Sequence, residues 1–283
     1  MSKVAIIIDS ASGVKDLSKY KDTYLVPLLI VKENGSSIDD DENFGAEQFE
    51  PLFEEQILKT SQCITGVMLE KWDNLLKEYD HIICLLISKG LSGQYSTFKV
   101  ISQSDEYGYK GRVHVVDTNG VSMILERQVM LAQKLLGMGK TVEETCQIIE
   151  DKYANIKGYI IPRKLDQLVR GGRISKAAAK MAKMLKITPI LSYTGEIDKE
   201  GKTRTFKKAV ATALDKVLTH LPKNYVLDVT YSKCDSELLN DVIKLIEERN
   251  IKIGLAVPMP YTIVCHTGYE TFGFLPDEVY EED

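Results

Sequence analysis

The segment LLISKGLSGQYST, residues 85–97, ends an apolar run with glycines and hydroxyl-bearing residues. A serine in this position could act as a nucleophile, or its hydroxyl could hold a bound anion by a hydrogen bond. The nucleophile elbow of many hydrolases has the order Gly-x-Ser-x-Gly. Here the order is Gly90-Leu91-Ser92-Gly93, which is one residue short on the far side. The segment alone leaves both roles open for Ser92.

Other hydroxyl and carboxyl groups follow predicted strands or precede predicted helices. In an open parallel sheet, ligands bind outside the carboxyl ends of the strands. Hydroxyls at helix N-termini suit a carboxylate or phosphate, because unpaired backbone N–H groups point there. For any single residue the alternative is an ordinary helix N-cap. Several such residues at one sheet edge predict an anion site. They are Asp9, Ser10, Thr60, Ser61, Ser88, Ser92, Asp117 and Thr118.

A catalytic serine would require a base, and His266 is the candidate histidine. We interpret the apolar segment 261–267 as a strand, which would place His266 at its end, facing a cleft. Ser92 with His266 as base, and with Asp9 or Asp117 as the group that orients the base, would form a hydrolase triad. The alternative is that His266 donates a hydrogen bond to the same anion that Ser92 holds.

A basic segment, residues 163–186, contains two adjacent glycines, Gly171 and Gly172. These glycines are expected to break a helix, so that Arg170 and Arg173 flank a turn. A planar guanidinium beside a turn suits recognition of phosphate or carboxylate. For the lysines of the segment, a solvated basic face is the simpler interpretation.

The acidic segment 39–50 has the acidic spacing of a calcium loop but carries Phe44 where the sharp turn requires glycine. We therefore expect a solvated loop and no metal site. The sequence contains no Walker motif and no complete Gly-x-Gly-x-x-Gly. A nucleotide or phosphate-ester enzyme is accordingly a weak alternative.

The elements that must position these residues alternate between strands and helices in the first half of the chain. The strands are continuous apolar runs, as expected where helices cover both faces of a parallel sheet. This pattern predicts an α/β fold with a doubly wound parallel sheet in an N-terminal domain, residues 1–155. The expected strands are 4–8, 24–31, 81–87 and 113–117, and the expected helices are 47–58, 69–79 and 122–136.

The second half predicts a C-terminal mixed α/β domain, residues 156–283. A basic helical segment follows the first strand of this half, and a polar, turn-rich segment is expected at 194–205. The expected strands are 159–162, 188–193, 225–232, 251–257 and 261–267, and the expected helices are 207–220 and 236–249.

The composition is that of a globular protein of the cytoplasm. The 283 residues are 44% hydrophobic and 27% charged, with a net charge of −5, which argues against a nucleic-acid partner. The five cysteines form no Cys-x-x-Cys pair, so a disulfide framework and a zinc site are both improbable. No apolar run approaches the ~20 residues that span a bilayer, so no transmembrane segment is expected.

The chain resembles the DegV family of bacterial fatty-acid-binding proteins, which includes the FakB subunits of fatty acid kinase. The resemblance extends over nearly the whole chain, and the matching motifs occur in the family's order. They are IIIDSAS at the N-terminus, KTSQ at 59–62, ISKGLSGQY at 87–95, VVDT at 115–118, LVRGGRIS at 168–175, PILSYTGEI at 189–197, TRTFKKA at 203–209 and HTGYETFGF at 266–274.

The resemblance implies a lipid-binding carrier with no catalysis of its own, no cofactor, and a long-chain fatty acid held between or within its two domains. Such a protein presents the carboxylate to a separate ATP-dependent fatty acid kinase, and the acyl phosphate can enter phospholipid metabolism. By resemblance, the positions that hold the carboxylate are Thr60 or Ser61, Ser92, Gly93 and His266. Arg170, Arg173 and Arg204 would face the kinase or stabilise the phosphorylated head group. The alternative function is a serine hydrolase of acyl esters that uses Ser92 and His266.

Overall fold

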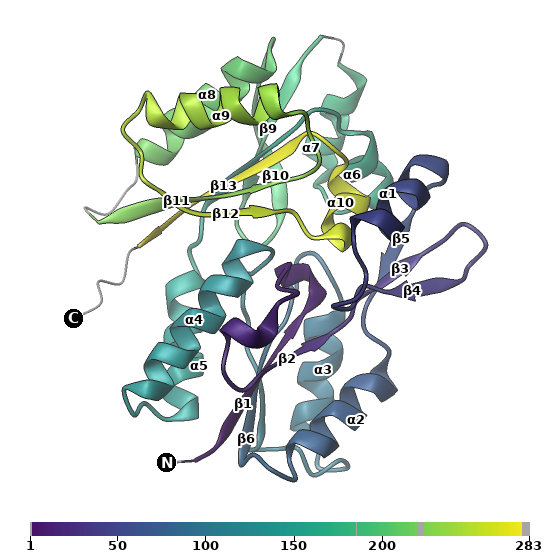
Figure 1. Cartoon of the computed structure of the whole chain (residues 1–283), viewed down its shortest axis with the longest axis vertical. Helices are drawn as coiled ribbons and strands as arrows, with labels where there is room; N and C mark the ends of the chain where they lie inside the picture. The colour runs from purple at the N-terminus through teal and green to yellow at the C-terminus, as the bar shows by residue number, and fades with distance from the viewer. Residues whose placement is uncertain (1, 185, 220–223, 279–283) are drawn as a thin grey trace. The chain divides into compact units, whose positions relative to one another are not determined.

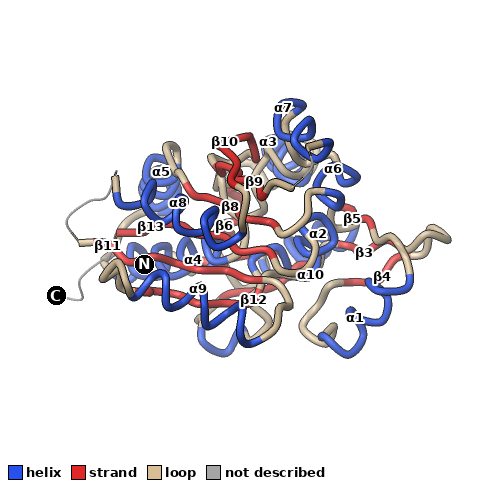
Figure 2. Tube along the Cα trace, turned by 90° about the horizontal axis from the view of Figure 1, so that it is seen from above, coloured by secondary structure: helices blue, strands red, loops and turns tan. Residues whose placement is uncertain are grey.

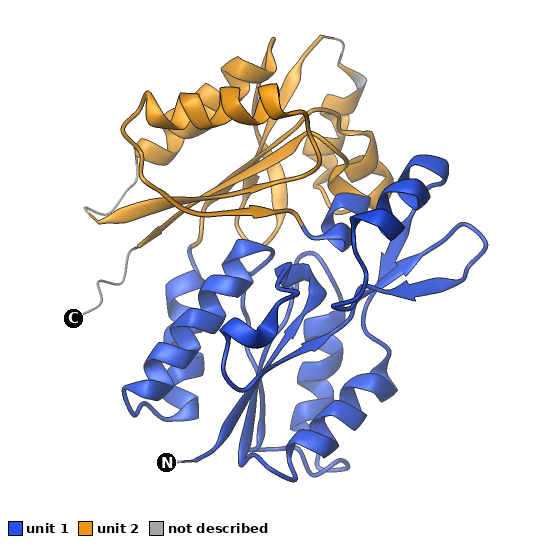
Figure 3. Cartoon of the chain, viewed as in Figure 1, with its two compact units in different colours: residues 1–155, 260–265 blue, residues 156–259, 266–283 orange. Residues whose placement is uncertain are grey.

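The computed structural model describes residues 2–184, 186–219 and 224–278 of the chain (Figure 1). The chain divides into two compact units: unit 1 comprises residues 1–155 and 260–265, and unit 2 comprises 156–259 and 266–283 (Figure 3). The predicted domains, 1–155 and 156–283, stay a prediction. The units differ from those ranges in residues 260–265, which belong to unit 1.

Unit 1 contains a four-stranded parallel sheet in the order β2-β1-β6-β7. Helices lie on both sides of this sheet in Figure 1, and the predicted doubly wound α/β architecture is confirmed. The strands are β1 (Val4–Asp9), β2 (Thr23–Val26), β6 (His81–Leu85) and β7 (Val113–Val115). The helices are α2 (Thr65–Leu75), α3 (Gln94–Gln103), α4 (Met123–Gly137) and α5 (Val142–Tyr153).

The apolar strands of this sheet are buried on both faces. On one face, Ile7 and Ile82 pack in a cluster with Met68 and Trp72 of α2 and with Phe98 of α3. Neighbouring strand residues that point to the opposite face are equally buried. Continuous rather than alternating apolar runs are the result of this double burial.

The predicted strand 24–31 is wrong as a single element, because Pro27 separates β2 from β3 (Leu29–Val31). Proline has no N–H to donate to a sheet, and the chain leaves the parallel sheet at this point. A small antiparallel sheet in the order β4-β3-β5 follows, accompanied by helix α1. Its remaining elements are β4 (Ser37–Asp39), α1 (Ala46–Glu55) and β5 (Lys59–Ser61).

Unit 2 contains a six-stranded mixed sheet in the order β10-β9-β8-β13-β11-β12, which confirms the predicted mixed α/β class. Among the described strands of this sheet, β11 and β12 pair in parallel and the other neighbours pair antiparallel. The strands are β8 (Gly158–Pro162), β9 (Thr188–Tyr193), β10 (Ile197–Thr203), β11 (Tyr225–Tyr231), β12 (Ile253–Pro258) and β13 (Thr271–Glu278).

Two long helices of unit 2, α8 (Phe206–Leu218) and α9 (Ser236–Glu247), share one apolar core with the sheet. Figure 2 shows the same helices beside the strands in a second view. Two short helices, α6 (Asp166–Gly171) and α7 (Lys176–Ala179), form the basic segment, and a 3₁₀ turn at Lys180–Lys183 follows them. Gly172 has a left-handed backbone with φ of 65° and ends α6, as the two glycines predicted.

Two predicted elements of the second half are wrong, and one extends past the described residues. The expected strand at 261–267 is a helix, α10 (Tyr261–Thr267), so His266 lies in the last turn of a helix. The expected turn-rich segment at 194–205 contains strand β10. The helix predicted at 207–220 ends at Leu218, and residue 220 lies outside the described part of the chain.

Candidate functional site

The carboxylate of Asp9 connects three segments at the carboxyl edge of the parallel sheet. Asp9 is fully buried at the end of β1. Its Oδ1 accepts a hydrogen bond from the backbone N of Ala11 at 3.0 Å. Its Oδ2 accepts from the backbone N of Ile87 at 2.7 Å and from Nε2 of Gln94 at 2.6 Å. Burial raises the pKa of Asp9 to about 7, although these N–H donors oppose the shift.

Gln94, the first residue of α3, links the start of that helix to the segment that follows β5. Its Oε1 accepts a hydrogen bond from the backbone N of Cys63 at 2.8 Å. A second link lies nearby, where the Thr97 hydroxyl donates to Oε1 of Gln62 at 3.1 Å. The two side chains of α3 therefore hold residues 62–63 against the beginning of the helix.

These links bring together four of the predicted site residues in unit 1. Thr60 and Ser61 end β5 directly before the tethered residues, while Ser92 and Gly93 directly precede Gln94. Thr60 and Ser92 are half-buried, and Ser61 and Gly93 are exposed. Two hydroxyl-bearing segments that are about 30 residues apart in the sequence thus meet at one edge of the sheet.

The Ser92 hydroxyl accepts a local hydrogen bond in the turn before helix α3. Its Oγ accepts from the backbone N of Gln94 at 3.2 Å, and its backbone N donates to the carbonyl of Ser88 at 3.1 Å. The N-cap position of α3 is Gly93, so Ser92 does not cap this helix. Because the bond from Gln94 uses an oxygen lone pair, it does not occupy the Ser92 O–H as a donor.

A small apolar cluster adjoins the hydroxyls. Its buried members are Ala11, Leu28, Ile87 and Leu125, which come from the ends of β1 and β6 and from neighbouring segments. The half-buried Leu91, Val121 and Ile263 pack against it. Leu91 directly precedes Ser92, so apolar and hydroxyl groups occur side by side in this turn.

A buried ion pair lies at the start of the acidic segment 39–50, whose spacing resembles that of a calcium loop. Lys15 Nζ lies 2.5 Å from Oδ1 of Asp40, whose side chain is fully buried. Burial raises the pKa of Asp40, while Lys15, Ser10 and the backbone N of Thr262 interact with the charged form and lower it. Within unit 1, Asp40 therefore lies beside the first turn of α10.

The aromatic ring of Tyr261 strengthens the same connection within unit 1. It stacks on Phe49 with ring centroids 4.7 Å apart and meets the edge of Phe44 at 5.8 Å. The Lys15 ammonium lies 5.9 Å from the Tyr261 ring centroid. In residues 2–184, 186–219 and 224–278, no group of three or more His, Cys, Asp or Glu could hold a metal ion.

In unit 2, His266 packs directly against the backbone of Gly171. A Cβ at Gly171 would lie 2.3 Å from Nδ1 of the imidazole, so only glycine leaves enough room for the ring. Arg173 donates a hydrogen bond to the Gly171 carbonyl, which places its guanidinium beside the same turn. Burial and the charge of Arg173 lower the pKa of His266 to about 4. The imidazole is therefore neutral at physiological pH.

Unit 2 thus brings His266 and Arg173 together, whereas the side chains of the other two predicted arginines are exposed. Arg170 is exposed at the end of α6, and Arg204 is exposed between β10 and α8. Sequence reasoning overlooked the organising side chains Gln94, Gln62, Lys15 and Asp40. Gln62 and Gln94 lie in the quoted motifs KTSQ and ISKGLSGQY, and Asp40 lies in the acidic segment 39–50, whereas Lys15 lies in no segment that the sequence singled out.

The two carboxylates expected to orient a catalytic histidine are engaged with other groups. Asp9 accepts the three N–H bonds described above, and Asp117 lies 2.5 Å from Nζ of Lys89. The neutral imidazole of His266, with its lowered pKa, is also a weak base. The geometry gives no specific support for the hydrolase alternative.

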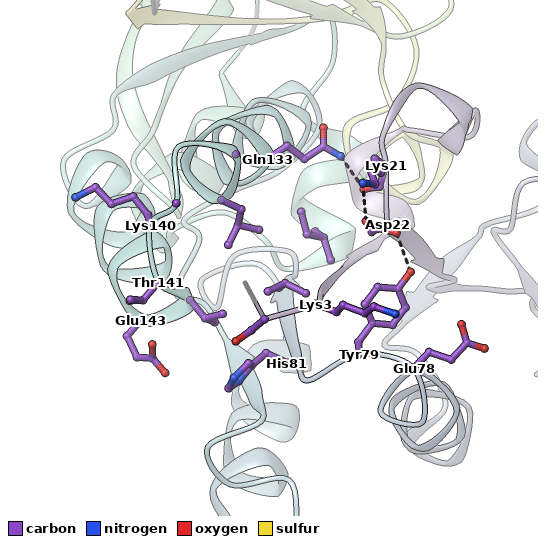
Figure 4. Close-up of a pocket in the computed structure, with 17 residues that line it drawn as sticks. Lys3, Lys21, Asp22, Glu78, Tyr79, His81, Gln133, Lys140, Thr141 and Glu143 are labelled. Atoms are coloured by element: carbon purple, nitrogen blue, oxygen red, sulfur yellow. Dashed lines mark hydrogen bonds and ion pairs between the residues drawn. The ribbon is translucent and has the colours of Figure 1, made fainter.

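A cavity of about 900 Å³ lies in unit 1, at the opposite end of the sheet from Asp9. Figure 4 shows charged and polar groups around it, including Lys3, Asp22, Tyr79 and His81. The hydroxyl of Tyr79 donates to Oδ1 of Asp22 at 2.8 Å. This cavity is lined by the amino ends of β1 and β6 and contains none of the predicted site residues.

The family model of DegV matches residues 3–277. The chain belongs to the DegV family. A DegV domain-containing protein of Mycoplasmopsis pulmonis is 31% identical over 277 residues, which cover 94% of this chain and 92% of the relative. One from Staphylococcus aureus is 25% identical and is covered over 99% of its length.

Solved structures of DegV proteins have the same fold. A fatty-acid-binding DegV protein of Thermus thermophilus matches with a TM-score of 0.85 and 26% identity, covering 98% of this chain and 100% of the other. A Thermotoga maritima protein described as having a fatty acid binding function matches with a TM-score of 0.79 and 26% identity, covering 99% and 100%. Among the described residues, no helix has the length and apolar character required to cross a membrane.

Proposed function

We propose that this DegV protein binds a long-chain fatty acid and presents its carboxylate to a separate ATP-dependent kinase. The observation that carries the proposal is the meeting of two hydroxyl-bearing segments, Thr60–Ser61 and Ser92–Gly93, beside an apolar cluster. Hydroxyls and the first N–H groups of a helix suit a carboxylate, and the apolar cluster suits the start of a tail. The fatty acid binding described for the Thermus and Thermotoga relatives supports the proposal.

The tail supplies most of the affinity, and the hydroxyls set the direction of the ligand. Burial of an acyl tail contributes roughly 0.8 kcal/mol per methylene, on the order of 10 kcal/mol gross for a chain of about sixteen carbons. A hydrogen bond to a charged group contributes only about 1.5–3 kcal/mol. Ser92 is therefore a group that holds the ligand, and we propose no nucleophilic step for it.

The roles proposed for the groups of unit 2 follow from the chemistry of each side chain. A neutral His266 can donate one N–H to a carboxylate without adding a positive charge. Arg173 beside it, together with Arg170 and Arg204, contacts the kinase or stabilises the added phosphate, because guanidinium groups pair well with phosphate oxygens. The protein itself carries no catalytic group in this scheme, and it works in the cytoplasm with the kinase.

The first test is mass spectrometry of the lipid released when the purified protein is denatured. A stoichiometric long-chain fatty acid is the expected result. Failure to release or take up any fatty acid would refute the carrier function and would justify a test with an active-site serine probe.

Variants of one helix region test the role of Ser92. Ser92→Ala should weaken binding of palmitate by roughly tenfold or more, the equivalent of one hydrogen bond to a charged group. Ser96→Ala, an exposed serine on α3, is the matched control and should bind as the wild type does. Equal affinities in the two variants would contradict the assigned role.

The kinase step is tested separately with a bacterial fatty acid kinase, ATP and lipid-loaded protein. Arg173→Ala should retain palmitate but slow acyl-phosphate formation. Arg112→Ala serves as a control, because this arginine binds backbone carbonyls at the end of the sheet remote from Asp9. If Arg173→Ala loses palmitate instead, then Arg173 is part of the lipid site.

A further inference from the structure

The side chain of Gln94 has a role that its position in the sequence does not reveal. It bridges the buried Asp9 carboxylate and the backbone N of Cys63, over distances of 2.6 Å and 2.8 Å. It is itself fully buried, so water cannot substitute easily for either partner.

The orientation of the Gln94 amide is determined by its two neighbours. The backbone N–H of Cys63 can only donate a hydrogen bond, so the amide oxygen of Gln94 must face it. The NH₂ group then faces Oδ2 of Asp9, which accepts from it. A reversed amide would place the NH₂ group against the donor at Cys63. Cys63 and Asp9 therefore fix the Gln94 amide, and Gln94 connects the chain at residue 63 to Asp9.

This chain of hydrogen bonds connects the two hydroxyl-bearing segments. Cys63 follows Ser61 by two residues, and Gln94 follows Ser92 by two residues. The Ser92 hydroxyl also accepts a hydrogen bond from the backbone N of Gln94, so both contacts involve this residue. The hydrogen bond from Thr97 to Gln62 is a second polar link between residues 62–63 and α3.

We propose that Gln94, oriented by Asp9, is a positioning residue that sets the spacing between the hydroxyls of Thr60 and Ser61 and that of Ser92. It thereby determines how strongly the site prefers a carboxylate head group. This inference rests on the proposed function, because it assigns those hydroxyls to a fatty acid head group. Gln94 itself does not contact the fatty acid in this proposal.

The test compares palmitate with hexadecanol, which has the same tail but no carboxylate. Gln94→Met keeps the length and approximate shape of the side chain and removes both hydrogen bonds. The preference for palmitate over hexadecanol should fall by about tenfold or more, while hexadecanol affinity stays near that of the wild type. Gln103→Met, an exposed glutamine at the end of α3, is the matched control and should keep the wild-type ratio.

Two outcomes would overturn the inference. An unchanged ratio in Gln94→Met would show that the bridge does not set head-group preference. An equal loss of affinity for both ligands would show a general structural role instead. If Gln94→Met fails to fold, Thr97→Val removes the neighbouring link to Gln62, and the same ratio is measured on it.

A wild-type protein that binds neither ligand would refute the proposed function, and this result is distinct from failure of the inference. The positioning role is then judged by amide hydrogen exchange at Cys63. Faster exchange in Gln94→Met than in Gln103→Met would support the bridge, and equal exchange would overturn it.

Discussion

Gly171→Ala tests how tightly His266 is held in unit 2. The added Cβ would lie 2.3 Å from the imidazole Nδ1 and 3.3 Å from its Cγ. Carbon and nitrogen atoms in contact lie more than about 3.4 Å apart, so the ring or the α6 backbone must move by about 1 Å. Overpacking of this kind in a buried site typically costs about 1–3 kcal/mol.

Urea unfolding measures this cost as a lower midpoint at an unchanged slope. Gly201→Ala in β10 is the matched control, because its Cβ would meet only Ile190 Cδ1, at 3.9 Å. The NMR signals of the His266 ring should shift in Gly171→Ala and stay unchanged in Gly201→Ala. Equal midpoints and an unshifted His266 signal would refute the close packing of the imidazole on this turn.

Three further predictions concern buried charges. Folding lowers the pKa of His266 from 6.5 to about 4, so the folded state binds fewer protons than the unfolded state between these pH values. The free energy of unfolding should therefore fall by roughly 3 kcal/mol from pH 6.5 to pH 4. Urea titrations of His266→Gln should not show this pH dependence. Folding raises the pKa of Asp9 from 3.8 to about 7, so the folded state binds more protons than the unfolded state between these pH values. The contribution of Asp9 to the free energy of unfolding is therefore lost as the pH rises through this range, by roughly 4 kcal/mol. Infrared titration of the buried carboxyl should show a midpoint near 7, and a midpoint near 4 would contradict the effect of burial. Lys15→Met leaves the buried Asp40 without its cation and should destabilise unit 1 by about 3 kcal/mol. The control Lys19→Met, at an exposed lysine, should change the urea midpoint little. Equal midpoints in the two variants would show that the ion pair of Lys15 and Asp40 is not required for stability.

The doubly wound sheet could be predicted because its strands are apolar on both faces. The runs at 4–8 and 82–87 have no charged residue, serine, asparagine, glycine or proline that would suggest a loop, and they make up most of strands β1 and β6. Segment 261–267 misled the prediction because Ile263 and Val264 are β-branched, which favours strands. Its helical form is supported by partners remote in sequence, such as Phe44 and Asp40, that no local pattern reveals.

The hydroxyls of the candidate site could be selected from the sequence because they end strands or precede helices. The side chains that organise them could not. Gln94 meets Asp9 across 85 residues and Cys63 across 31, and these pairings appear only when the sheet has formed. A glutamine near a helix start is otherwise an ordinary surface residue.

Strand β10 escaped prediction because it carries charges at Asp198, Lys199, Glu200 and Lys202. It lies at one edge of the six-stranded sheet, where it pairs with β9 and forms one isolated bridge from Ile197 to Ile174. An edge strand exposes a row of backbone groups to which a strand of another molecule can add. The charges on β10, together with the bulge between Lys199 and Gly201, make such an addition unfavourable. The features that concealed this strand in the sequence therefore also protect unit 2 against aggregation through this edge.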